Sequence, residues 1–135
     1  LRHVAQPHRI VRLGAPVLPT GPAMGTLPDL SGSGRIVTYQ AGTGVGAVDV
    51  VGGGAETVAT TGTRPSISAD GRRVAFTTPT ALNEPGGPAG QVDAYVRDRP
   101  GGTPLRASER VGGGGAGVAS GPTVISANGG TVGID

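Results

Sequence analysis

The stretch RPSISADGRRVAF, at residues 64 to 76, decides how this chain is read, because close variants of it recur. PDLSGSGRIVTY occupies residues 28 to 39 and VISANGGTVGI occupies 124 to 134. The copies align serines at Ser31, Ser68 and Ser126, and glycines at Gly34, Gly71 and Gly129. Each copy has the pattern of a short strand, a glycine-containing turn and a second strand. The sequence therefore predicts a repeated β-hairpin.

A dipeptide suited to a tight turn lies between the strands of each copy. The three dipeptides are Ser33-Gly34, Asp70-Gly71 and Asn128-Gly129. Glycine adopts positive φ freely and Asn or Asp tolerates it, as the primed turns of two-residue hairpin loops require. We therefore expect these six residues to be structural and each loop to contain two residues.

A triplet of bulky, small and bulky residues follows each turn. The triplets are Val37-Thr38-Tyr39, Val74-Ala75-Phe76 and Val132-Gly133-Ile134. Because side chains alternate between the two faces of a strand, the bulky pair lies on one face and the small residue on the other. One face can fill a core while the other admits a close neighbour, so we expect these sheets to stack.

The spacing of the strands predicts an all-β fold, a β-propeller fragment of about three four-stranded antiparallel blades in an open arc. Residues 1 to 13 are expected to supply the outer strands of a preceding blade. One blade covers 28 to 63, a second with long loops covers 64 to 110, and 121 to 135 begin a further blade, with loops at 14 to 27 and 111 to 120. The chain does not begin with Met, so we expect further blades of the same polypeptide to complete the ring.

Composition excludes several classes of protein. Of 135 residues, 27 are Gly and 12 are Pro, which we interpret as turn chemistry; disorder is the alternative, chiefly at 14 to 27 and 111 to 121. All 11 basic residues are Arg and they are scattered, with only three aromatic residues, which disfavours nucleic-acid binding. The absence of Cys excludes disulfides and thiolate sites. No apolar run approaches the roughly 18 residues of a membrane span.

Signals of catalysis are weak, and we expect no enzyme, no cofactor and no metal site in this chain. Residues 42 to 47 fit a relaxed dinucleotide-binding pattern, but a strand-like segment follows, so we interpret them as a loop. The chain has no Gly-x-Ser-x-Gly motif and no Ser, His and Asp arrangement. Asp93 and Asp98 are expected to satisfy strand-end amides or to pair with Arg97, Arg99 or Arg72.

The segments PSISADGRRVAFT at 65 to 77, DAYVRDR at 93 to 99 and TPLRASE resemble the TolB-type, WD40-like β-propeller repeats of bacterial extracytoplasmic proteins. The resemblance is strongest over 64 to 110, while residues 85 to 90 depart from it and lack the acid and amide of that loop. It implies a non-catalytic module acting as a protein-interaction or cell-envelope scaffold, in the periplasm, at the cell surface or secreted. The alternative is the gating propeller domain of a larger hydrolase, similar to prolyl oligopeptidase, with its catalytic domain outside this chain.

Two lengthened connections, at 79 to 91 and 110 to 122, leave the second blade from the same end. Loops on a rigid scaffold often carry binding sites, so Asn83, Glu84 and Arg110 are candidate contacts for a protein or cell-envelope partner. The alternative is that both connections are solvated, glycine-rich spacers.

Overall fold

The computed structural model describes residues 25 to 82, 91 to 108 and 121 to 135. Within these ranges the chain is all-β, with two four-stranded antiparallel sheets and one two-stranded hairpin. The strands expected at 1 to 13, the loop expected at 111 to 120, and the candidate contacts Asn83, Glu84 and Arg110 lie outside the described residues, as does the loop expected at 14 to 27 except for residues 25 to 27.

Each four-stranded sheet is a meander in which every strand pairs with the next one along the chain. The first blade contains β1 (Thr26–Leu30), β2 (Ile36–Ala41), β3 (Gly44–Asp49) and β4 (Ala55–Ala59). The second blade contains β5 (Thr63–Ile67), β6 (Arg73–Thr78), β7 (Asp93–Asp98) and β8 (Leu105–Arg106). The third hairpin contains β9 (Thr123–Ile125) and β10 (Val132–Ile134).

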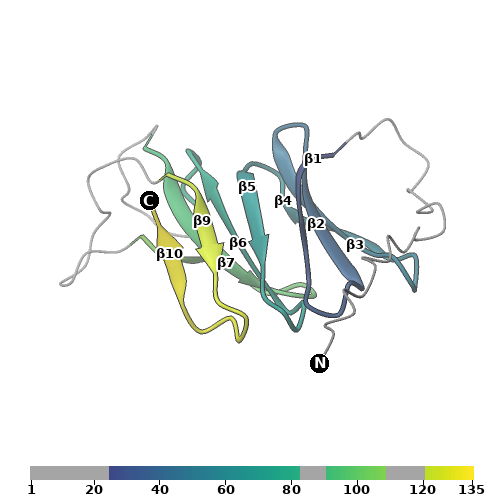
Figure 1. Ribbon diagram of the computed structural model, residues 1–135. Helices are drawn as coiled ribbons and strands as arrows, with labels where there is room; N and C mark the ends of the chain where they lie inside the picture. Colours follow the sequence, from purple (N-terminus) through teal and green to yellow (C-terminus); the bar gives the residue numbers. More distant parts are fainter. Residues whose placement is uncertain (1–24, 83–90, 109–120) are drawn as a thin grey trace, which may run out of the picture.

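The sheets stand side by side as an open arc (Figure 1), which confirms the predicted propeller fragment. Strand β5 lies between β1 and β9, so the first strands of the three units are neighbours. Backbone hydrogen bonds join the units at aligned positions: the Gly32 amide donates to the Ala69 carbonyl, and the Ala69 amide donates to the Ala127 carbonyl, both at 2.9 Å. The repeat therefore determines how successive units join as well as how each one folds.

The main core lies between the two blades. The leading face of each blade is the face that carries the bulky pair of the triplet. In the second blade it presents Ile67, Val74 and Phe76, which are 6%, 0% and 0% exposed. These side chains share one cluster with Val45 and Val58 of the first blade. The bulky face of one blade thus packs on the small-residue face of the blade before it.

The turn in the three repeated hairpins is not the predicted one. The carbonyls of Ser31, Ser68 and Ser126 accept bonds from the amides of Gly34, Gly71 and Gly129, at 2.8, 2.9 and 2.8 Å. The same serines donate their amides to the carbonyls of Ile36, Arg73 and Thr131. Each loop therefore has four residues, and the prediction of two-residue loops with primed turns was wrong. Positive φ occurs at the glycines, with values of 72°, 74° and 69°, and at no other residue of these loops.

Side chains explain why the loop is wider than predicted. The hydroxyls of Ser31, Ser68 and Ser126 accept the amides of Ile36, Arg73 and Thr131 at 2.9 to 3.0 Å, which closes the far side of the loop. Asp70 and Asn128 each accept the amide two residues further on, at 2.9 Å. Such local side-chain bonds stabilise a turn without primed backbone geometry.

Two boundaries also differ from the sequence interpretation. Strand β1 begins at Thr26, so residues 26 and 27 belong to a strand rather than to the loop predicted at 14 to 27. Strand β3 begins at Gly44, inside the predicted loop at 42 to 47. The glycines of β3 permit close packing, because a Cβ on Gly44 would lie 2.6 Å from the Ala59 carbonyl oxygen.

Candidate functional site

The candidate site is the inner-strand surface, formed where β1, β5 and β9 lie next to one another. A hollow of about 370 Å³ opens here. Its lining comes from all three units: Leu27, Pro28 and Asp29, then Arg64, Pro65 and Ser66, then Thr123 and Val124. These residues hold aligned places in the repeat, so the hollow is built by the stacking of the units.

Two residues of this surface have an uncommon backbone conformation. Leu27 and Arg64 have φ values of 50° and 53°, and they occupy aligned positions directly before Pro28 and Pro65. Each lies where the pairing register of its strand shifts, between Thr26 and Asp29 and between Thr63 and Ser66. Left-handed backbone costs a residue other than glycine on the order of 1 kcal/mol or more, and such strain is often found at functional positions.

Polar side chains hold the inner strands together. The Asp29 carboxylate accepts the Ile67 amide at 2.8 Å and the Ser66 hydroxyl at 3.1 Å. One unit further on, the Ser66 hydroxyl accepts the Ile125 amide at 3.3 Å. Asp29 and Ser66 align in the repeat, so the same position links each unit to the next. These bonds fix the spacing of the three strands and hence the shape of the hollow.

The exposed groups of this surface combine apolar area with one cation. Leu27 is 50% exposed and Val124 is 64% exposed. Arg64 is exposed and forms no ion pair with a carboxylate of the residues that the structure describes. A guanidinium beside apolar side chains suits a ligand that has both a carboxylate and an apolar group.

Other charged groups serve the scaffold. Glu56 on β4 receives a bond from Arg99 at 3.0 Å and one from the Gly101 amide at 3.1 Å, both from the second blade. Arg97 donates to the carbonyls of Thr57 and Val58 in the first blade. These contacts link the outer strands of the two blades. The charged groups of Glu56, Arg97 and Arg99 therefore have partners within the fold.

The carboxylates of β7 have partners that the sequence did not predict. Asp93 lies 3.6 Å from Arg106 and accepts the Ser108 hydroxyl at 2.9 Å, with Asp93 and Arg106 almost fully buried. Asp98 pairs with Arg73 at 2.8 Å. The expected partners Arg97, Arg99 and Arg72 were wrong for both, because Arg97 and Arg99 extend toward the first blade.

Two further carboxylates have lowered pKa values because of local hydrogen bonds. The pKa of Asp49 lies well below its usual range, chiefly because Arg35 donates to it, with the Gly52 and Val51 amides adding to the effect. The pKa of Asp70 is lowered by the Ser68 hydroxyl and the Arg72 amide. Both groups stay ionised within turns, which is a structural role.

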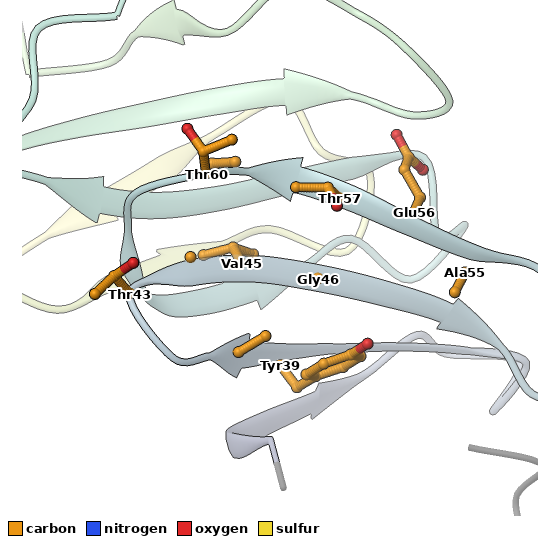
Figure 2. Close-up of a pocket in the computed structure, with 11 residues that line it drawn as sticks. Tyr39, Thr43, Val45, Gly46, Ala55, Glu56, Thr57 and Thr60 are labelled. Atoms are coloured by element: carbon orange, nitrogen blue, oxygen red, sulfur yellow. The ribbon is translucent and has the colours of Figure 1, made fainter. Parts of the chain in front are cut away.

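A second hollow, of about 350 Å³, opens on the leading face of the first blade. Figure 2 shows Tyr39 from β2 and Gly46 from β3 on its floor, with Ala55 and Thr57 from β4 beside them. Gly46 pairs with Tyr39 across the two strands, and a Cβ on Gly46 would lie 2.8 Å from the Tyr39 ring. The hollow therefore exists because β3 carries no side chain at this position.

Within the described ranges, no three His, Asp or Glu side chains gather as metal ligands, and no helix is long and apolar enough to cross a membrane. The side chains of Ser33, Asp70 and Asn128 bond to the serine two residues earlier in the same loop. The carbonyls of Gly71 and Gly129 accept bonds from Arg99 and Arg73, which lie outside those loops. Sequence reasoning missed Leu27, Asp29, Arg64 and Ser66. The alignment of LPDLS at 27 to 31 with RPSIS at 64 to 68, with a proline second in each, was the available signal.

Comparison with known proteins identifies the fold. No family model matches this sequence, and no curated protein matches it. TolB from Acinetobacter baumannii is similar over 83% of this chain, with a TM-score of 0.59 and 17% identity. The tricorn protease is similar over 78%, with a TM-score of 0.55 and 16% identity. The chain spans 26% of the length of that TolB structure and 10% of that of the protease.

Proposed function

We propose, from a TolB-like β-propeller fold, that this chain is part of a non-catalytic propeller that holds a protein partner on its inner-strand surface. The observation that supports the proposal most directly is the repeated left-handed backbone at Leu27 and Arg64. Both residues line the same hollow, beside Asp29 and Ser66, which tie the strands together. Strain maintained at two aligned positions of one surface is expected where side chains must be aimed at a partner.

The partner's binding segment should combine a carboxylate with an apolar side chain. Arg64 supplies a fork of donors for a carboxylate, and exposed Leu27 and Val124 supply apolar contact. An extended peptide matches a surface made of parallel inner strands better than a compact ligand does, because the hollow runs across three units. Asn83, Glu84 and Arg110 would add contacts from the lengthened connections.

The subcellular location that fits this role is outside the cytoplasm, where the protein would be part of a cell-envelope scaffold. The support for it is the likeness of the fold to TolB together with the repeat pattern, which resembles that of extracytoplasmic bacterial proteins. A scaffold of this kind needs a rigid frame, which the hydrogen-bonded links between units provide.

Selection from a displayed random-peptide library tests the proposal. The unchanged chain should enrich peptides that carry Asp or Glu next to Leu, Ile, Val or Phe. Arg64→Glu should weaken binding of those peptides by at least about tenfold, since it replaces an attraction by a repulsion.

Arg72→Glu is the matched control, because it makes the same change of charge at an exposed arginine that lies in a hairpin loop away from the hollow. It should bind the selected peptides as the unchanged chain does. Peptides whose affinity is insensitive to Arg64→Glu would show that the inner-strand surface is not the binding site.

A second candidate is a gating propeller domain within a larger hydrolase. The likeness to the tricorn protease, a chain ten times longer than the matched part, is the observation that favours it. The sequence adjoining this chain in its gene distinguishes the two: a Gly-x-Ser-x-Gly motif with Asp and His supports the hydrolase, and further hairpin repeats support the scaffold.

A further inference from the structure

The leading face of the first blade is an unpartnered copy of a buried surface. Leu30, Val37 and Tyr39 align with Ile67, Val74 and Phe76, whose burial forms the core between the blades. Leu30 is 50% exposed, and Val37 and Tyr39 are half-buried. Among the described residues, nothing covers this face as the first blade covers the second.

The hollow at Gly46 shows what must cover the outer half of that face. In the second blade the equivalent place holds Tyr95, which pairs with Phe76, stacks on it with ring centroids 6.1 Å apart and is fully buried. The first blade has Gly46 there, opposite Tyr39. A side chain from another segment is needed to restore the packing that Tyr95 gives within its own sheet.

We propose that residues 1 to 13 supply it, by packing as two strands on the outer half of the leading face, with apolar side chains in the hollow above Gly46. The segment has the required chemistry, since Val11 and Leu13 alternate with Arg12 in RIVRL. In a strand this alternation places Val11 and Leu13 on one face and Ile10 and Arg12 on the other.

The connection is long enough for this placement. Residues 14 to 24 separate the segment from the described part of the chain. Eleven residues span up to about 36 Å when extended. Crossing a four-stranded sheet takes only about 14 Å, at about 4.8 Å per strand spacing. The outer strands β3 and β4, which border the hollow, are therefore within reach of residues 1 to 13.

Disulfide trapping in the full chain tests the placement, and the natural absence of Cys gives a clean background. Thr57, exposed at the hollow and opposite Gly46 across β3 and β4, is the anchor as Thr57→Cys. Combined with Val11→Cys or Leu13→Cys, it should form a cross-link at least about tenfold faster than with Ile10→Cys or Arg12→Cys. Equal rates for the two sets, or no cross-link in either, would overturn the proposal.

Nitration of tyrosine gives an independent reading, because the chain has only two tyrosines and Tyr95 is 0% exposed. Tyr39 should react several-fold faster when Val11→Asp and Leu13→Asp are combined in the full chain, while Tyr95 stays unreactive and reports that the fold is intact. An unchanged rate at Tyr39 would contradict the proposal. Protection that disappears on dilution would also contradict it, since a second copy would then be the cover.

Discussion

The first and second blades share one pattern but differ in what their leading faces meet. Ile67, Val74 and Phe76 of the second blade are buried against the first, whereas the aligned Leu30 remains half exposed. Each blade is a four-stranded meander with the same strand order and closely matching register. The difference shows that a repeat position has no fixed energetic value, because its contribution depends on the neighbouring unit.

The fourth strands of the two blades also show that the contribution of a repeat position depends on the neighbouring unit. Glu56 on β4 is held by Arg99 and Gly101 of the second blade, while the aligned Leu105 on β8 is 68% exposed. Both residues pair with equivalent positions of the third strand, opposite Ala47 and Val96. At this one position, on the face opposite the leading face, a charged residue is therefore held where a full blade follows, and an apolar residue is exposed where only the hairpin β9 and β10 follows.

The largest expected contrast is between Ile67→Ala and Leu30→Ala. Ile67→Ala should lower the free energy of unfolding by about 3 kcal/mol, since it removes a buried side chain from the core between the blades. Leu30→Ala should lower it by less than about 1 kcal/mol, because half of that side chain is already in water. Urea denaturation followed by far-UV circular dichroism measures both.

Similar losses for the two variants would break the comparison between the blades. They would mean that the inner part of the first blade's leading face is covered in solution as fully as that of the second. Residues 1 to 13, placed on the outer half, would not account for such a result.

The next contrast is between Gly71→Ala and Gly34→Ala. Both glycines have φ near 73°, so either substitution costs about 1 kcal/mol in backbone strain. A Cβ on Gly71 would also lie 2.9 Å from the Ile36 side chain, whereas one on Gly34 meets no atom of the described residues within 4 Å. Gly71→Ala should therefore cost about 1 to 2 kcal/mol more than Gly34→Ala.

Thermal unfolding of both variants checks this difference, with Arg72→Ala as the control in the same loop. The Arg72 side chain is exposed and should change stability by no more than about 0.5 kcal/mol. Equal shifts in Tm for the two glycine variants would show that the strain of the turn, rather than the contact between blades, decides the role of this glycine.

Much of this architecture could be predicted from the sequence, because a hairpin is a local structure. The aligned serines and glycines identified all three hairpins, and alternation identified which residues share a face. The predicted loop length was wrong because the decisive bonds, which the amides of Ile36 and Arg73 donate to the Ser31 and Ser68 hydroxyls, are not visible in a dipeptide pattern.

The candidate site could not be predicted in the same way, because it arises between units. Asp29 reads as an ordinary turn or strand-end residue until its bonds to Ser66 and Ile67, more than 35 residues away, are known. The backbone of Leu27 and Arg64 is equally hidden, since a residue before proline is expected to be extended. Stacking of the sheets is what turns these positions into one surface.

The smallest expected effect concerns the β3–β4 turn, which the first blade holds with its own residues. Arg35 and the amides of Val51 and Gly52 bond Asp49, whereas the β7–β8 turn of the second blade is held through Gly101 by Glu56 of its neighbour. The pKa of Asp49 is lowered in the folded chain, so the unfolded chain binds its proton more tightly. The stabilisation from Asp49 is thus complete above its ordinary pKa of about 3.9 and is lost as the pH falls toward the lower pKa of Asp49 in the folded chain.

Asp49→Asn should make stability less dependent on pH in acid, and Arg35→Ala should do so in part, because the backbone amides still bond Asp49. Urea midpoints measured at a series of acidic pH values check both, and parallel curves for all three proteins would show that the Asp49 turn contributes nothing to acid sensitivity.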